Sequence, residues 1–155
     1  GALFLKKKAG RPNYQYIGER FQSLCALADS YGIRLTLENV HWCQYHEVGY
    51  AKNLRPFLED CSLGYTLDVK QAAQSGYPME MGDRLCNLHL CDITEQEQMV
   101  YTSLPGQGNF DFVHLAALLR EKNFNGAVTM EVYPDDWEKE NELRQSFAFL
   151  RALFE

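Results

Sequence analysis

The amino-acid sequence predicts an α/β fold in which β-strands alternate with α-helices. Apolar runs of strand length recur along the chain, and the segments between them carry apolar residues at helical spacing. No long linker or low-complexity segment separates these elements. Helices and strands that alternate at such short intervals indicate a parallel sheet with helices packed outside it. We therefore expect one domain that spans residues 1–155.

The first half of the chain carries the signals for two helices and two strands. Residues 14–31 have apolar side chains on one helical face, and Gly32 follows as a C-terminal stop. Residues 33–40, with the sequence IRLTLENV, form an apolar run that predicts a strand. A short helix is expected over 51–60, and a second strand over 63–69.

The second half repeats the alternation. Residues 70–83 are expected to form two short helical pieces, because Gly76 and Pro78 interrupt the helical pattern. Asp111 is a good N-cap residue that follows a loop rich in Gly and Pro. The remaining elements are two apolar runs that predict strands and two amphipathic segments that predict helices: 84–93 and 126–133, and 112–122 and 138–154.

Four parallel strands amount to half of a (β/α)₈ barrel, which typically needs about 250 residues. We expect about four β/α units with parallel strands and outer helices, that is, a half barrel of the TIM-barrel type. A half barrel exposes strand edges, and open edges favour association with other chains. Three arrangements would cover them: a homodimer, an N-terminal half supplied separately, or an open sheet covered by residues 1–16. We favour the homodimer.

Charge and composition exclude several classes of protein. The net charge is −6, whereas a phosphate-binding surface needs clustered Lys and Arg, so we expect no nucleic-acid partner. No apolar stretch approaches the length of a membrane span, so we expect no membrane partner. The five cysteines are odd in number and lack CxxC spacing, which favours a reducing, cytoplasmic location.

Four side chains of metal-binding type stand near the C-terminal ends of the four expected strands: Glu38, Asp68, His89 and Glu131. Each one alone is compatible with a helix cap, a salt bridge or a solvated side chain. Because the C-terminal ends of parallel strands converge on one face of a barrel, the four together predict a shared site. Three carboxylates and one imidazole suit Mn²⁺, Mg²⁺, Co²⁺ or Zn²⁺. Each residue also interrupts an apolar run, where a carboxylate needs a partner or a bound cation.

Five segments, in this order, resemble the last four strands of the sugar phosphate isomerase/epimerase family: LTLENV, YTLDVKQA, NLHLCDI, LPGQGNFDF and AVTMEVY. That family, also grouped as AP endonuclease family 2, shares the xylose isomerase-like TIM barrel with ketose 3-epimerases and endonuclease IV. The resemblance covers nearly the whole chain and implies the C-terminal half of the barrel. It implies that Glu38, Asp68, His89 and Glu131 are metal ligands. Glu38 and Glu131 would also be the catalytic acid/base pair, on opposite sides of the substrate carbon.

The activity implied by this resemblance is the isomerisation or epimerisation of a sugar or sugar phosphate with a divalent metal ion. Such an ion, bound to a carbonyl and its neighbouring hydroxyl, stabilises the enediolate that forms when a carbon-bound proton is removed. One carboxylate removes the proton and the other returns one. The main alternative is a non-catalytic, truncated half barrel that binds metal or sugar.

Four further residues are candidate substrate contacts: His41, Trp42, Gln71 and Asp92. His41 and Trp42 follow the strand of Glu38 and would form a wall of the sugar pocket, although packing alone would equally explain Trp42. Gln71 stands where relatives have a histidine, and its amide can hydrogen-bond a substrate hydroxyl. Its neighbour Lys70 is expected to be solvated.

Two departures from the family pattern bear on the substrate. Glu95 stands where ketose 3-epimerases have an arginine, which weakens the hypothesis of a free-ketose epimerase. Val100 and Thr102 stand where endonuclease IV has an aspartate and a histidine. An abasic-site endonuclease is therefore the least favoured function.

Overall fold

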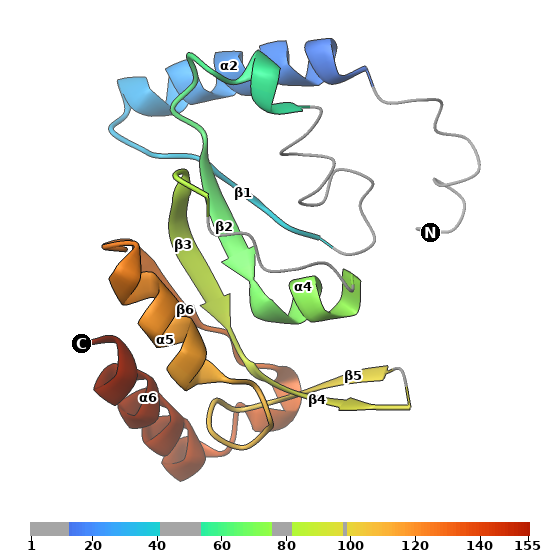
Figure 1. Ribbon diagram of the computed structural model, residues 1–155, viewed down its shortest axis with the longest axis vertical. Helices are drawn as coiled ribbons and strands as arrows, with labels where there is room; N and C mark the ends of the chain where they lie inside the picture. Colours follow the sequence, from blue (N-terminus) through green and yellow to red (C-terminus); the bar gives the residue numbers. More distant parts are fainter. Residues whose placement is uncertain (1–12, 41–53, 76–81, 98) are drawn as a thin grey trace.

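A parallel, four-stranded sheet forms the centre of the chain, in the order β1-β2-β3-β6 (Figure 1). The computed structural model describes residues 13–40, 54–75, 82–97 and 99–155. The four strands are β1 (Thr36–Glu38), β2 (Gly64–Asp68), β3 (Leu85–Leu90) and β6 (Ala127–Met130). Every neighbouring pair is parallel, so all four strands end at the same edge of the sheet. The predicted α/β class with parallel strands and outer helices is thereby confirmed.

The helices follow the predicted positions: α2 (Tyr14–Ser30), α4 (Val69–Ser75), α5 (Phe112–Glu121) and α6 (Glu140–Phe154). Asp111 caps α5 as predicted, since its Oδ1 accepts a hydrogen bond of 2.8 Å from the backbone N–H of His114. Asn13 caps α2 in the same way through the N–H of Tyr16. The helices α5 and α6 lie together beside the sheet, whereas α2 lies at its other end (Figure 1).

Two apolar clusters hold these layers together. The larger one joins β2, β3, α5 and α6 through fully buried leucines such as Leu67, Leu88 and Leu115. The smaller one packs α2 on the segment that leads into β2: Cys25, Leu54, Leu58, Cys61 and Leu63. Burying one leucine of this kind contributes about 1.5–3 kcal/mol relative to leaving it exposed.

Three expectations need correction or lie outside the described residues. The strand expected over 33–40 is only Thr36–Glu38, because β1 is an edge strand that pairs with β2 over three residues. The helix expected over 51–60 is wrong for its described part, where Arg55–Phe57 makes a single 3₁₀ turn. The helical piece expected after Gly76 lies outside the described residues.

The strand expected over 84–93 is two strands, and this β-hairpin was not predicted. The parallel strand β3 ends at Leu90, and β4 (Asp92–Gln96) pairs antiparallel with β5 (Met99–Ser103). The hairpin projects from the edge of the sheet where the strands end (Figure 1). The apolar positions shift from even (Leu88, Leu90) to odd (Cys91, Ile93) at this point, but the run 84–93 is apolar enough to be taken for one strand.

Asp92, at the start of the hairpin, organises the loop that returns to α5. Its Oδ1 accepts hydrogen bonds from the backbone N–H groups of Ile93 and Phe110, at 2.9 and 3.0 Å. Its Oδ2 accepts a third from Gly106 at 2.8 Å. A side chain at Gly108 would place its Cβ 2.5 Å from Asp92 Oδ1, so this loop requires glycine there.

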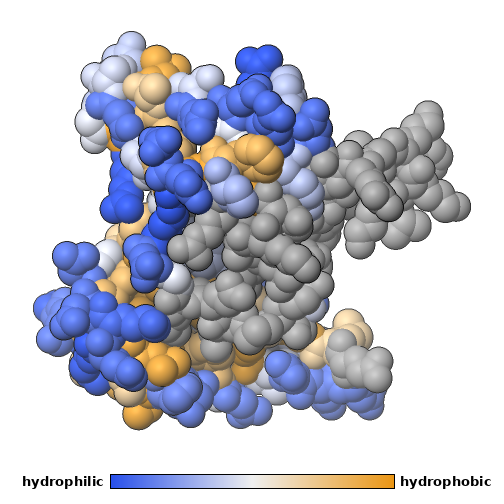
Figure 2. Space-filling model, turned by 45° about the horizontal axis from the view of Figure 1, so that its top comes forward, coloured by the Kyte–Doolittle hydropathy of each residue, from blue (hydrophilic) through white to orange (hydrophobic). Residues whose placement is uncertain are grey.

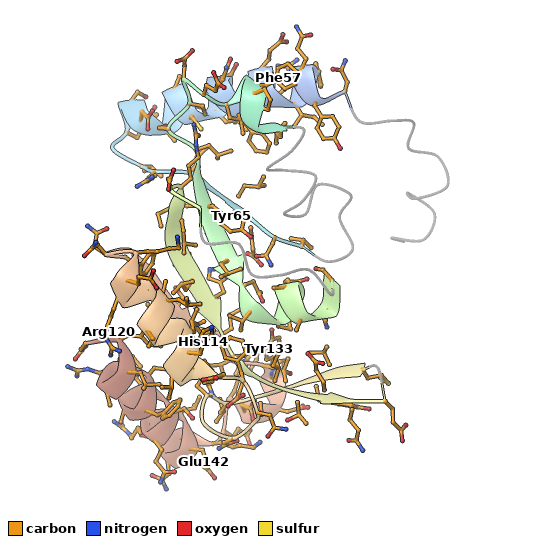
Figure 3. All side chains as sticks on the ribbon, viewed as in Figure 1. Phe57, Tyr65, His114, Arg120, Tyr133 and Glu142 are labelled. Atoms are coloured by element: carbon orange, nitrogen blue, oxygen red, sulfur yellow. The ribbon has the colours of Figure 1, made fainter. Side chains whose placement is uncertain are left out.

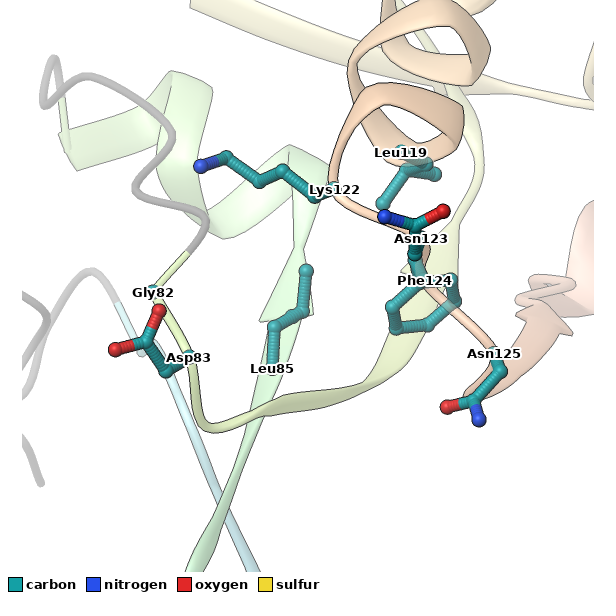
Figure 4. Close-up of a pocket in the computed structure, with 8 residues that line it drawn as sticks. All are labelled: Gly82, Asp83, Leu85, Leu119, Lys122, Asn123, Phe124 and Asn125. Atoms are coloured by element: carbon teal, nitrogen blue, oxygen red, sulfur yellow. The ribbon is translucent and has the colours of Figure 1, made fainter.

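A hollow of about 400 Å³ opens at the opposite edge of the sheet, where β3 and β6 begin (Figure 4). Among the residues that line it are Asp83, Leu85, Lys122 and Asn125.

No helix in the described part of the chain is long and apolar enough to cross a bilayer.

Candidate metal centre

Four side chains meet at the C-terminal edge of the sheet, one from each strand. Glu38 ends β1, Asp68 ends β2, His89 lies in β3, and Glu131 directly follows β6. One ligand atom from each lies within 4.8 Å of those of the other three. Parallel pairing explains the meeting, because it aligns the ends of all four strands; the Cα partner of Asp68, for example, is His89.

The atoms that face the centre of the cluster have the chemistry of a cation site. His89 Nδ1 lies 3.4 Å from Glu38 Oε2 and 3.2 Å from Glu131 Oε1. Two of the cluster's buried atoms, Asp68 Oδ2 and His89 Nδ1, have no hydrogen-bond partner among the described residues. A buried polar atom without a partner carries a desolvation penalty, which coordination to a cation removes. The residues present therefore fit a divalent metal ion.

The electrostatics of the cluster point the same way. Burial raises the pKa of the Glu38 carboxyl, nearby Asp68 and Glu131 raise it further, and the His89 ring opposes this rise. Burial also raises the pKa of Asp68, against the lowering effect of the N–H of Gln71. The negative charges of Glu38 and Asp68 are thus poorly compensated in the absence of a bound cation.

Glu38→Gln is expected to make the metal-free protein more stable than the wild type at neutral pH. Since the folded-state pKa of Glu38 is raised, the wild type loses stability as the pH rises from the ordinary value of 4.5 toward the raised pKa. A neutral amide undergoes no such loss. Urea denaturation in EDTA should give equal free energies of unfolding below pH 4.5 and a higher value for the variant at neutral pH.

Saturating Mn²⁺ should reverse this order, because only the wild type keeps all four ligands. Glu121→Gln, at the exposed end of α5, is the matched control and should leave the pH dependence unchanged. A Glu38→Gln protein that is less stable than the metal-free wild type at every pH would contradict the argument.

Asn39 and Gln71 hold two of the ligands in place. The buried amide of Asn39 donates to the backbone carbonyl of Asp68 at 2.9 Å and accepts from its N–H at 2.7 Å. These bonds tie the end of β1, and with it Glu38, to the end of β2. Asp68 Oδ1 in turn accepts from the N–H of Gln71 at 2.9 Å, which leaves Oδ2 for the cluster.

A layer of polar side chains lies beneath the ligands, each two residues before one of them and so on the same face of its strand: Thr36, Thr66, Asn87 and Thr129. Thr66 Oγ1 donates to Thr36 Oγ1 at 2.7 Å, and Thr129 Oγ1 donates to Asn87 Oδ1 at 3.5 Å. Asn87 Nδ2 lies 3.4 Å from Thr66 Oγ1 and 3.1 Å from His89 Nε2. The layer thereby orients the imidazole so that Nδ1 faces the carboxylates.

Two residues of the site were missed by sequence reasoning. The expectation that Lys70 is solvated is wrong: its side chain is 15% exposed, and Nζ lies 3.9 Å from Glu131 Oε2. Lys70 also donates to the hydroxyl of Tyr133, which donates to Glu131 Oε2 at 3.0 Å. Figure 3 shows Tyr133 near the end of β3, where the hairpin begins. A signal for Tyr133 existed, since it follows Glu131 by two residues, but none distinguished Lys70 from a surface lysine.

The four candidate substrate contacts have different outcomes. Gln71 lies in the first turn of α4, next to the cluster, and its substrate role stays a prediction. Asp92 is not brought into the cluster; both of its carboxylate oxygens are bonded to backbone N–H groups of the loop. His41 and Trp42 lie outside the described residues.

The profile of the Xylose isomerase-like TIM barrel family matches residues 4–153. The chain belongs to this family. No curated protein sequence matches it significantly.

Solved structures share the fold at low sequence identity. A D-psicose 3-epimerase crystallised with D-fructose matches 96% of this chain and 60% of its own, with a TM-score of 0.69 at 16% identity. The IOLI protein with a bound zinc atom matches 88% and 54%, with a TM-score of 0.71 at 18% identity. A xylose isomerase-like TIM barrel protein from Mycobacterium smegmatis, in complex with magnesium, matches 94% and 52%, with a TM-score of 0.65 at 18% identity. This family member thus spans little more than half the length of these three structures.

Proposed function

We propose that this chain carries the metal-binding half of a divalent-metal-dependent sugar or sugar phosphate isomerase/epimerase. The observation that carries the proposal is the cluster of Glu38, Asp68, His89 and Glu131, whose buried Asp68 Oδ2 and His89 Nδ1 have no hydrogen-bond partner among the described residues. Mn²⁺, Mg²⁺, Co²⁺ and Zn²⁺ all accept such a mixed set of oxygen and nitrogen ligands. The zinc- and magnesium-containing relatives support a divalent ion.

In this proposal Glu38 and Glu131 move protons and Asp68 and His89 serve as ligands. An ion held by the four side chains would act as a Lewis acid toward a carbonyl oxygen of the sugar. Glu38 Oε2 and Glu131 Oε1 lie 3.4 and 3.2 Å from His89 Nδ1. Glu38 belongs to β1 and Glu131 follows β6, the two outer strands of the sheet, so they stand on either side of Asp68 and His89. One would remove a proton from the carbon next to the carbonyl. Return by the other to the opposite face gives epimerisation, and return to the adjacent carbon gives isomerisation.

The substrate class rests on the relatives, one of which is an epimerase crystallised with D-fructose. Gln71, on the first turn of α4, is the proposed contact for a substrate hydroxyl. The proposed substrate is therefore a small sugar or sugar phosphate, and the proposed setting is cytoplasmic carbohydrate metabolism.

We also propose that the chain acts as a homodimer or together with an N-terminal half barrel. Both β1 and β6 are outer strands of the described sheet, each with one side unpaired within it. On α2, the side chains of Leu24 and Leu27 are 51% and 58% exposed. Figure 2 shows hydrophobic patches on the upper part of the molecule, where α2 lies. Exposed strand edges and apolar patches support association. Sedimentation velocity at micromolar concentration should show a species larger than the monomer, and a stable monomer would contradict the dimer.

Deuterium exchange at a sugar carbon tests the activity directly. The protein, loaded with Mn²⁺ or Co²⁺, is incubated in D₂O with D-fructose, other ketoses and aldoses, and their phosphates. For at least one sugar, proton NMR should show that the signal of the hydrogen bonded to the carbon next to the carbonyl disappears. Glu38→Gln should abolish this exchange, whereas Glu121→Gln should leave it unchanged.

Two negative outcomes have different meanings. Stoichiometric metal without exchange on any sugar would sink the enzymatic proposal and favour a non-catalytic half barrel that binds metal. Absence of metal binding in any assembly state would refute the site itself.

A further inference from the structure

The two carboxylate oxygens of Glu131 face different neighbours. Oε1 points into the cluster, 3.2 Å from His89 Nδ1. Oε2 accepts a hydrogen bond of 3.0 Å from the hydroxyl of Tyr133 and lies 3.9 Å from Lys70 Nζ. One oxygen is therefore directed to the ion site and the other is engaged by the protein.

Lys70 and Tyr133 are fixed to each other as well as to Glu131. The Lys70 ammonium donates to the Tyr133 hydroxyl and lies 4.7 Å from the centroid of its ring. Lys70 is the second residue of α4, and Tyr133 lies beyond the end of β6, so the contact joins two separate elements. The ammonium over the ring face adds a cation–π attraction to the hydrogen bond.

The two carboxylate oxygens of Asp68 also have different surroundings. Its Oδ1 accepts from the N–H of Gln71 at 2.9 Å, and its Oδ2 is buried without a partner among the described residues. The ligands Asp68 and Glu131 thus each keep one oxygen for the ion. Gln71 and Lys70 are neighbours on the first turn of α4, so one helix terminus restrains both ligands.

We propose that Lys70 and Tyr133 are a positioning pair that makes Glu131 a ligand through one oxygen, presenting Oε1 to the ion and retaining Oε2. This inference rests on the proposed metal site. A carboxylate can bind a metal ion through both oxygens, but Glu131 would then have to give up a hydrogen bond to Tyr133 and its attraction to Lys70. Restraint of this kind sets the coordination number and leaves room for a substrate oxygen.

Charge balance gives Lys70 a second reason to be in the site. A divalent ion, three carboxylates and one ammonium sum to a neutral site, with His89 neutral as a ligand. Without Lys70 the same site would keep one negative charge in partly buried surroundings, which is unfavourable. Lys70 therefore supports all three carboxylates, although Glu131 is the one among them that pairs with its ammonium.

Tyr133→Phe and Lys70→Met test the pair by their effect on bound Co²⁺. Calorimetry should show that Tyr133→Phe lowers Co²⁺ affinity about 10- to 100-fold, as loss of an outer hydrogen bond to a ligand typically does. The visible absorption of bound Co²⁺ should also weaken, because the second oxygen of Glu131 raises the coordination number. Lys70→Met should shift both measurements in the same direction, and Lys70→Arg should restore most of the affinity.

Matched controls separate positioning from general damage. Tyr101→Phe removes an exposed tyrosine hydroxyl from β5, and Lys122→Met removes an exposed ammonium after α5; neither should alter the affinity or the spectrum. Circular dichroism checks that each variant is folded. If Tyr133→Phe fails to fold, the Co²⁺ affinity and spectrum of Lys70→Met alone test the positioning pair.

The outcomes distinguish the two proposals. If the wild type binds Co²⁺ and both variants match its affinity and spectrum, the positioning pair is refuted and the metal site stands. If the wild type binds no Co²⁺, both are refuted.

Discussion

Asp68→Asn and His89→Ala are each expected to lower the affinity for Mn²⁺ by at least about 100-fold, because loss of a ligand exceeds the loss caused by outer-shell changes. Asp68 Oδ2 and His89 Nδ1 are the two atoms of the cluster that are buried without a hydrogen-bond partner among the described residues. Neither atom is in contact with solvent in the folded chain. Each variant therefore removes a ligand that no described neighbour replaces.

Titration calorimetry and elemental analysis measure this effect, and thermal unfolding gives an independent readout. An ion at 100 times its dissociation constant stabilises the folded state by about 2.7 kcal/mol, and the variants should lose this gain. Asp83→Asn and His114→Ala are the matched controls, since both residues are exposed and lie outside the cluster. A His89→Ala protein with wild-type metal content would place the ion elsewhere.

Asp92→Ala is expected to reduce the free energy of unfolding by about 2–5 kcal/mol, since it leaves backbone N–H groups of the loop without an acceptor. The carboxylate is 1% exposed and accepts from Ile93, Gly106 and Phe110. Hydrogen bonds to a charged acceptor are stronger than neutral ones, so removal of three of them is a large change.

Urea denaturation of the metal-free protein measures the loss, with Glu95→Ala in the exposed part of the same hairpin as the control. Asp92→Asn should fall between the wild type and the alanine variant, because an amide oxygen replaces only part of the carboxylate. A change below about 1 kcal/mol for Asp92→Ala would leave the carboxylate free for the substrate role predicted from the sequence.

The parallel sheet and its outer helices could be predicted because their signals are local. The helix expected over 14–31 and the cap at Asp111 depend on residues close in sequence, and both are confirmed. The β4–β5 hairpin could not, because the change from parallel to antiparallel pairing depends on which strand each residue meets, and residues 84–93 resemble one apolar run. Tertiary pairing also shortened β1 at the edge of the sheet.

The candidate site also has one part that the sequence predicts and one part that it does not. The convergence of Glu38, Asp68, His89 and Glu131 follows from strand ends alone, and the structure brings the four together. The partners of these ligands come from contacts between distant segments. Lys70 reaches Tyr133 across 63 positions of the chain, and no local pattern records such a contact.

The amide of Asn39 also determines which way Glu38 points. The strand β1 has three residues and one neighbour, so backbone pairing specifies its alignment weakly. A slip by one position would turn Glu38 to the other face of the sheet, toward the helices, and put Leu37 among the ligands. The two hydrogen bonds between the Asn39 amide and the backbone of Asp68 can form in only one alignment of β1 against β2. The side chain of Asn39 therefore fixes the register of β1. A residue outside the cluster thus decides whether the candidate site has its fourth side chain.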